Sequence, residues 1–173
     1  MSQEFTAGKE KKMTGGIAMK VAIASDHGGY QLKKHITDYL QESGYTHQDF
    51  GTLSAESVDY PDFALLVAKA VAQGEYDLGI LCCGTGIGVN IVANKVTGIR
   101  AAHCHDTFSA RMSRQHNDAN VLTMGERVVG RGLAIDIVKE FLAGKYAGGR
   151  HVCRVEKIKE IETKFLGQGD PGL

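Results

Sequence analysis

The chain has 173 residues, 43% of them hydrophobic and 23% charged, and its 20 Lys and Arg balance its 20 Asp and Glu. This length predicts one domain whose core is large enough to fold without disulfides or a structural metal. The balanced charge and the lack of a long apolar segment argue against nucleic acid and membrane as partners.

The four cysteines show no CxxC pair and no spacing typical of a disulfide framework. Together with the lack of a secretory leader, this predicts a reducing, cytoplasmic environment. Residues 1–18 mix charged residues with Gly, Thr and Ser and show no periodic apolar positions, so we expect a disordered N-terminal extension. We expect the folded domain over residues 19–165 and a C-terminal tail at 166–173.

From residue 19 onward, short apolar runs alternate with helical patterns, which predicts βαβ units on a parallel sheet. Each expected strand is short and mostly apolar, as is typical of strands covered on both faces. The five strands are expected at 19–24, 46–50, 78–83, 99–104 and 121–124. Helical spacing of apolar residues predicts helices at 30–43, 61–74, 88–95, 107–115, 133–142 and 155–165.

Polar residues follow three of the expected strands. Ligands of open α/β sheets bind beyond the carboxyl ends of the strands, so these residues should converge at one edge. They are Asp26, His27, Cys83, Thr85, His105 and Asp106.

Residues 77–90 run from an apolar strand into a thiol, Cys83, and three alternating glycines, Gly84, Gly86 and Gly88. Such glycines let backbone N–H groups face an anion at the start of the next helix. The loop has neither a P-loop lysine nor a GxGxxG pattern, so nucleotide binding is weakly supported. Thr85 could donate a hydrogen bond to developing negative charge. Cys83 could also be a small core residue, as strand alternation predicts for Cys82 on the opposite face.

Two further motifs have competing interpretations. Asp26 and the following His-Gly-Gly could bind a sugar hydroxyl and a phosphate, or simply cap a helix and form a turn. His103 to Asp106 contains zinc-ligand residue types. Because Cys104 should point away from the two histidines in a strand, we favour a polar cluster at the strand end and expect no metal.

His116 lies at a helix end, where it could serve only as a partner of the helix dipole. Arg127, Arg150 and Arg154 lie in or beside glycine-containing loops. Their guanidinium groups are suited to bidentate phosphate contact, although solvated surface arginines are common.

Several short motifs occur in a specific order and spacing. They are SDHGG at 25–29, DYP at 59–61, GILCCGTGIG at 79–88, ANK at 93–95, GIR at 98–100, SRQHN at 113–117, RVVG at 127–130 and GRH at 149–151. Together they resemble the type B ribose-5-phosphate isomerase family, which includes the galactose-6-phosphate and allose-6-phosphate isomerases. The resemblance covers residues 19 to about 162.

The resemblance implies a Rossmann-like three-layer α/β/α sandwich on a five-stranded parallel sheet. It also implies a homodimer, sometimes a dimer of dimers, in which each active site is completed by the neighbouring subunit. The expected reaction interconverts ribose 5-phosphate and ribulose 5-phosphate in the pentose phosphate pathway, without a cofactor. The alternatives are an allose-6-phosphate or galactose-6-phosphate isomerase and, more remotely, a noncatalytic module that binds a phosphosugar or nucleotide.

Carried over by position, the resemblance makes Cys83 the catalytic base and His116 a ring-opening group. Thr85 and the loop from Gly84 to Asn90 correspond to the enediolate cradle. Asp26 corresponds to a contact of the ring oxygen and hydroxyls. The phosphate-binding set corresponds to His27, Arg127, Arg150 and Arg154, and the pocket lining to Tyr60 and Asn117. A family branch with a glutamate base has that glutamate at the position of Val89, so this chain resembles the cysteine branch.

Overall fold

A computed structural model describes residues 19–165 of the chain, so the expected extension at 1–18 and the tail at 166–173 lie outside the described residues. The sheet has five parallel strands in the order β2-β1-β3-β5-β4, which confirms the expected fold class. The strands are β1 Lys20–Ser25, β2 Thr46–Asp49, β3 Leu78–Cys83, β4 Ala101–His103 and β5 Val121–Gly125.

All six expected helices are present, with ends that differ from expectation by up to three residues. They are α1 Tyr30–Glu42, α2 Tyr60–Ala72, α3 Ile87–Ala93, α4 Thr107–Asn117, α5 Arg131–Ala143 and α6 Val152–Phe165. Two short 3₁₀ helices, η1 His27–Gly29 and η2 Gly149–His151, precede α1 and α6. The early start of α6 follows from η2, which leads directly into it.

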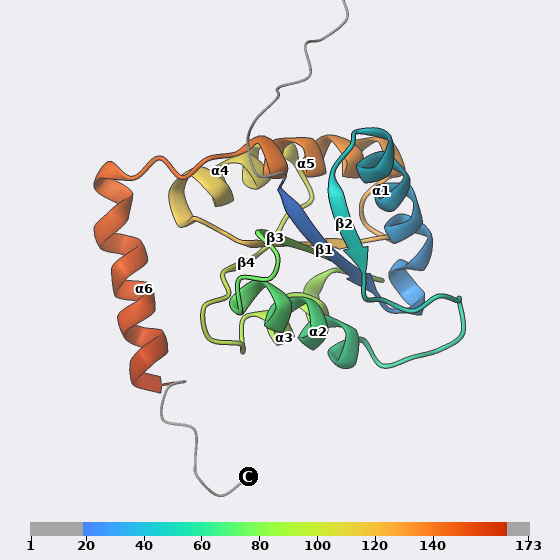
Figure 1. Cartoon of the computed structure of the whole chain (residues 1–173), viewed down its shortest axis with the longest axis horizontal. Coiled ribbons are helices and arrows are strands. Elements are labelled where there is room, and N and C mark those ends of the chain that lie inside the picture. Colours follow the sequence, from blue (N-terminus) through green and yellow to red (C-terminus); the bar gives the residue numbers. More distant parts are fainter. Residues whose placement is uncertain (1–18, 166–173) are drawn as a thin grey trace, which may run out of the picture.

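The helices cover both faces of the sheet, with α1, α4 and α5 on one side and α2 and α3 on the other (Figure 1). Ile23, Ile36 and Phe141 belong to the core of the first side, and Val67 and Leu81 to that of the second. Residues 19–165 therefore form one three-layer domain. None of the helices in this range is long and apolar enough to cross a membrane.

The edge strand β2 differs from the expectation of mostly apolar strands. Its sequence is Thr-His-Gln-Asp, and its residues alternate between exposed and half-buried. Because β2 buries little apolar surface, its position is fixed by parallel pairing with β1 and by contacts of a buried lysine. The Nζ of Lys33 in α1 donates to Asp49 Oδ2 at 2.7 Å and to the Thr52 carbonyl at 2.6 Å. These contacts fix the carboxyl end of β2 and the loop that follows it.

Helix α6 stands apart from the sheet (Figure 1), and Val155 is its only buried residue. Glu162 Oε1 ties it to the body by accepting a hydrogen bond from the Gly98 N–H at 2.9 Å. A groove of about 540 Å³ lies between α6 and the region of β4. Its apolar walls include Ile158, Ile161 and Phe165 from α6, and Ile99, Ala101, Ala102 and Ala119 from the body.

Candidate active site

Cys83 ends β3 at the carboxyl edge of the sheet and is only 4% exposed. Its Sγ accepts a hydrogen bond from the Gly86 N–H at 3.0 Å. A backbone donor at this position would stabilise a thiolate, which is the form of cysteine that can take up a proton. The turn between strand and helix thus brings the thiol and the glycine loop together, as the sequence predicts.

The glycine loop is closely packed by side chains from other elements. Gly86 has φ +80°, and a Cβ there would lie 2.5 Å from Cε1 of His103. A Cβ at Gly88 would lie 2.8 Å from the Tyr60 ring. A Cβ at Gly84 would lie 3.5 Å from the Arg127 guanidinium. The close approach of these neighbours requires glycine at 86 and 88, and it places Arg127 and Tyr60 beside the loop.

The turn after β5 is fixed to the cysteine loop by backbone hydrogen bonds. Glu126 N–H donates to the Cys83 carbonyl at 2.9 Å, and Arg127 N–H donates to the Gly84 carbonyl at 3.1 Å. The Glu126 carboxylate accepts from the Leu32 N–H at 2.8 Å, in the first turn of α1. Glu126 therefore joins α1 to the turn that carries Arg127, a role that sequence reasoning missed.

Asp26 and His27 follow β1 and lie against the same loop, because a Cβ at Gly28 would be 3.1 Å from the Gly84 nitrogen. Asp26 Oδ1 accepts from the Gly29 N–H at 3.0 Å, so this carboxylate caps η1. Its Oδ2 has no hydrogen-bond partner within residues 19–165. His27 Nδ1 lies 3.2 Å from both N and O of Val58, which fixes the ring.

The two adjacent thiols differ in environment. Cys82 belongs to the core on the α1 and α5 side, whereas Cys83 belongs to the side of α2 and α3, as strand alternation predicts. Complete burial, with smaller contributions from Cys83 and Glu126, raises the pKa of the Cys82 thiol far above its usual value. Cys82 therefore stays protonated and does not serve as a base.

The strand-end histidines do not form a metal centre with Cys104. His103 and His105 contact each other edge to face at 5.2 Å, while burial raises the pKa of the Cys104 thiol to about 11. Within residues 19–165, no group of three or more His, Cys, Asp or Glu side chains could hold a metal ion. Asp106 caps α4 by accepting from Ser109 N–H at 2.7 Å, so it is engaged in the fold.

A second cluster of predicted site residues surrounds His116. Its ring stacks on that of His151, with centroids 4.2 Å apart and an interplanar angle of 8°. The Nε of Arg150 lies 3.5 Å from His151 Nε2, and Arg154 follows in α6. Burial, followed by the nearby His116, Arg150 and Arg154, lowers the pKa of His151. His151 was part of a recognised motif, but sequence reasoning gave it no role.

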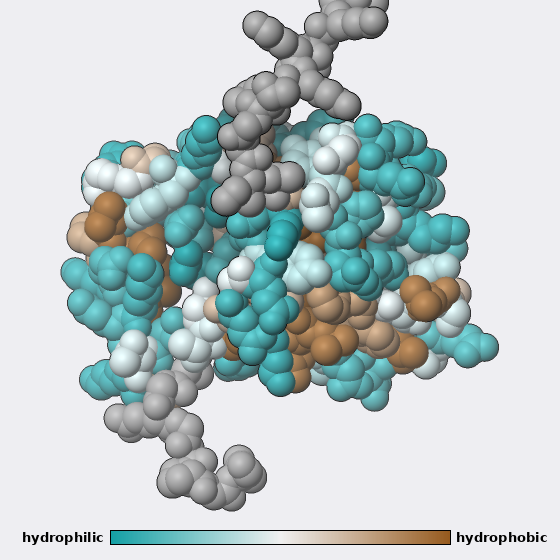
Figure 2. Space-filling model, viewed as in Figure 1, coloured by the Kyte–Doolittle hydropathy of each residue, from teal (hydrophilic) through white to brown (hydrophobic). Residues whose placement is uncertain are grey.

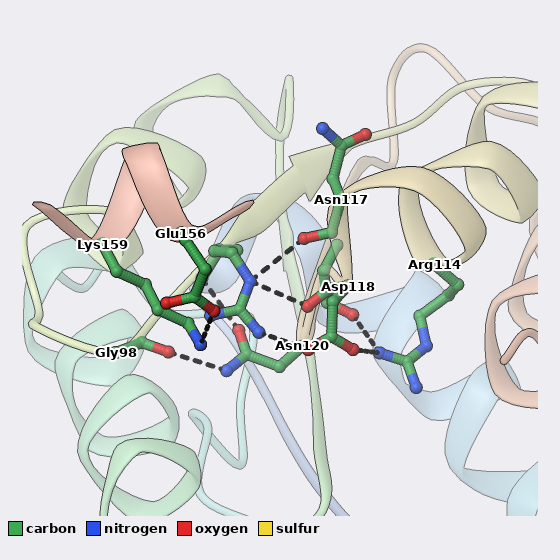
Figure 3. A network of polar contacts seen from close by, with 9 residues as sticks. Gly98, Arg114, Asn117, Asp118, Asn120, Glu156 and Lys159 are labelled. Carbon is green, nitrogen blue, oxygen red and sulfur yellow. Dashed lines mark hydrogen bonds and ion pairs between the residues drawn. The ribbon is translucent and has the colours of Figure 1, made fainter. Parts of the chain in front are cut away.

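A polar network fixes the end of α4 next to this cluster (Figure 3). Arg100 Nε donates to the carbonyls of Asn117 at 3.0 Å and Asp118 at 2.9 Å, and its terminal nitrogen donates to Asp118 Oδ2 at 2.8 Å. Arg114 reaches Asp118 Oδ1 at 3.5 Å. In Figure 3 the side-chain amide of Asn117 points away from these contacts, which leaves it available to a ligand.

The two clusters lie at opposite ends of the strands: the Cys83 cluster at their carboxyl ends and the His116 cluster at their amino ends. Cys83 pairs with Gly125, at the carboxyl end of β5, whereas α4 runs back toward Val121, which pairs with Gly79 at the start of the same two strands. Four residue steps of strand span about 13 Å. One chain therefore does not bring His116 to Cys83.

Asn90 lies in neither cluster. Its amide donates to the Ala101 carbonyl at 3.1 Å and its Oδ1 accepts from Asn94 at 3.3 Å, so it ties α3 to β4. Its role as a ligand stays a prediction.

Residues 21–158 match the model of a family described as Ribose/Galactose Isomerase. The chain is 53% identical to ribose-5-phosphate isomerase B of Escherichia coli, over 84% of this chain and 97% of that protein. It is 47% identical to D-erythrulose-4-phosphate isomerase of Pectobacterium atrosepticum, over 83% and 95% respectively. A solved structure of Clostridium thermocellum ribose-5-phosphate isomerase B superposes with a TM-score of 0.84 at 60% identity, covering 85% of this chain and 99% of that one. Fold, motif order and these similarities agree, and the chain belongs to the ribose/galactose isomerase family.

Proposed function

We propose that the chain interconverts ribose 5-phosphate and ribulose 5-phosphate through an enediolate, with Cys83 as the base, and so acts in the pentose phosphate pathway. The observation that carries this proposal is the Cys83 thiol, which accepts a hydrogen bond from the Gly86 N–H at 3.0 Å in the loop that the Arg127 guanidinium approaches at Gly84. A base, backbone donors for an oxyanion and a cation for phosphate thereby lie side by side at the carboxyl ends of the strands. The relative from Escherichia coli carries the name of this activity.

Ribose 5-phosphate is mostly a closed ring, so the reaction begins with ring opening. The C1–O4 bond breaks, the proton of the O1 hydroxyl is lost, and O4 gains one; we assign this transfer to His116 with Asp26. The Cys83 thiolate then takes the proton from C2 and returns it to C1, while a proton moves from O2 to O1. Thr85 and the loop amides stabilise the intermediate enediolate, and His27 with the arginines holds the phosphate.

We infer that each active site combines two copies of the chain. Cys83 and His116 lie at opposite ends of the strands within one copy, yet the same sugar must contact both residues. The groove beside α6 offers apolar surface for a second copy, and Figure 2 shows hydrophobic atoms along α6 and over α2 and α3. A twofold dimer would place the His116 cluster of each subunit at the Cys83 loop of the other, so that the dimer has two equivalent sites.

A substrate panel tests the activity. We expect kcat/KM to be highest for ribose 5-phosphate in an assay that follows ketose formation, with allose 6-phosphate, galactose 6-phosphate and erythrose 4-phosphate alongside. The four-carbon sugar is included because of the Pectobacterium atrosepticum relative. A higher kcat/KM for another sugar would transfer the assignment to that substrate. Binding of all four without turnover would favour a noncatalytic phosphosugar module.

Replacing Gly86 by Ala should lower kcat/KM for ribose 5-phosphate by at least about tenfold, because one lost backbone donor costs that much or more. Gly86 has φ +80°, and the new Cβ would displace either the His103 ring or the loop that donates to Cys83. Gly44→Ala is the matched control, since Gly44 has φ +75° with nothing within 4 Å. Equal kcat/KM for the two variants would contradict a role of the loop in catalysis.

A further inference from the structure

We propose that His151 is a positioning residue of the isomerase reaction, which holds the His116 ring and the Arg150 guanidinium as one rigid unit. The inference rests on the proposed function, because it concerns the groups that open the sugar ring and bind the phosphate. His151 contacts both the His116 ring and the Arg150 guanidinium, and it lies on the same chain as these two residues.

The first observation is the burial of His151 in an otherwise exposed segment. His151 is 9% exposed, while its neighbours Arg150 and Val152 are exposed and α6 buries only Val155. An imidazole is a costly group to bury unless it makes specific contacts. Here its face lies on the His116 ring, 4.2 Å away and nearly parallel.

The second observation concerns the protonation of His151. Arg150 Nε points at His151 Nε2 at 3.5 Å, and a guanidinium can only donate. Nε2 must therefore accept, which makes the ring neutral with its proton on Nδ1. The direction of the pKa shift agrees, because burial and three cationic or basic neighbours, His116, Arg150 and Arg154, disfavour a charged ring.

These contacts have a consequence for the reaction. The flat, neutral ring of His151 limits rotation of His116 without adding positive charge beside the group that takes up a proton. The same ring holds Arg150, which we assign to the phosphate. The stack thereby fixes the His116 ring at C1 and O4, where a small displacement lowers kcat, whereas release of Arg150 from the phosphate raises KM.

Two reactions separate a positioning role from a purely structural one. Isomerisation of ribose 5-phosphate needs ring opening. Exchange of the C1 proton of ribulose 5-phosphate with D₂O does not, because this ketose carries phosphate on the hydroxyl that would close the ring. Exchange needs Cys83, which takes the C1 proton and returns a solvent deuteron, and the loop donors that stabilise the enediolate, but not the ring-opening group. Both are measured at saturating substrate, the first by ketose formation and the second by NMR.

We expect His151→Ala to lower kcat for ribose 5-phosphate by at least about tenfold, a part of the roughly 10²- to 10⁴-fold that positioned proton transfer contributes, while C1 exchange changes less than about threefold. His151→Phe keeps a flat ring but loses the acceptor. It should keep kcat within about threefold and raise KM, because Arg150 is released. His47→Ala removes a half-buried histidine of β2 that contacts neither cluster, and it should change neither rate.

An equal loss of isomerisation and exchange in folded His151→Ala, or no loss of either, would overturn the proposal. So would a His151→Phe variant that loses kcat as fully as His151→Ala. Thermal unfolding of each variant shows whether it is folded. If the wild-type protein itself fails to isomerise ribose 5-phosphate, the proposed function fails and not the inference about His151.

Discussion

Replacing Cys83 by Ala should abolish isomerisation of ribose 5-phosphate, with a loss of about 10³-fold or more in kcat. The methyl group of Ala cannot accept a proton, and the Gly86 N–H that contacts Sγ has no other base beside it. Binding should persist, because the groups assigned to the phosphate lie on other side chains. The inactive variant should still gain thermal stability when ribose 5-phosphate is added.

Cys82→Ala is the matched control for this experiment. Cys82 is the neighbouring thiol, is fully buried on the other face of β3, and stays protonated because burial raises its pKa. Its loss should cost about 1 kcal/mol of stability through the small cavity that it leaves, and kcat should stay near that of the wild type. Near-normal turnover of Cys83→Ala, or equal loss of kcat in both variants, would remove Cys83 as the base.

The cluster around Cys83 could be predicted from the sequence because its residues are close together along the chain. A strand, a thiol and three alternating glycines lie within one short segment, and parallel strands bring Asp26 and Cys83 to the same edge. The sequence order alone grouped Asp106 with them. In the structure β5 lies between β3 and β4, so the turn with Arg127 lies next to the cysteine loop, while Asp106 caps α4.

The neighbours of the loop could not be predicted in the same way, because they depend on packing between distant segments. His103 was considered as a metal ligand, yet its ring fills the space beside Gly86. The stack of His116 on His151 joins α4 to η2, which are far apart in sequence. No periodicity or spacing encodes such a contact. The motif that contains His151 indicated that the residue belongs to the family pattern, without indicating its partner.

Mixing Cys83→Ala with His116→Asn should restore activity, although each variant alone is inactive. If each site takes Cys83 from one subunit and His116 from the other, a mixed dimer has one intact site and one doubly altered site. Random exchange at equal amounts makes half of the dimers mixed, so we expect about a quarter of wild-type activity for a twofold dimer. The two proteins are refolded together, and ketose formation from ribose 5-phosphate is measured. Sites contained within one chain would give no recovery.

The same substitutions placed together on one chain supply the control. When this double variant is mixed with wild-type protein in equal amounts, a shared site leaves every mixed dimer inactive, so about a quarter of the activity remains; independent sites would leave about half. The two mixtures contain identical numbers of altered residues and differ only in which chain carries them. A difference in folding or expression cannot reproduce both results. Recovery in the first mixture and excess loss in the second would therefore place His116 of one chain at the Cys83 loop of its partner, the arrangement we propose from the positions of the two clusters at opposite ends of the strands.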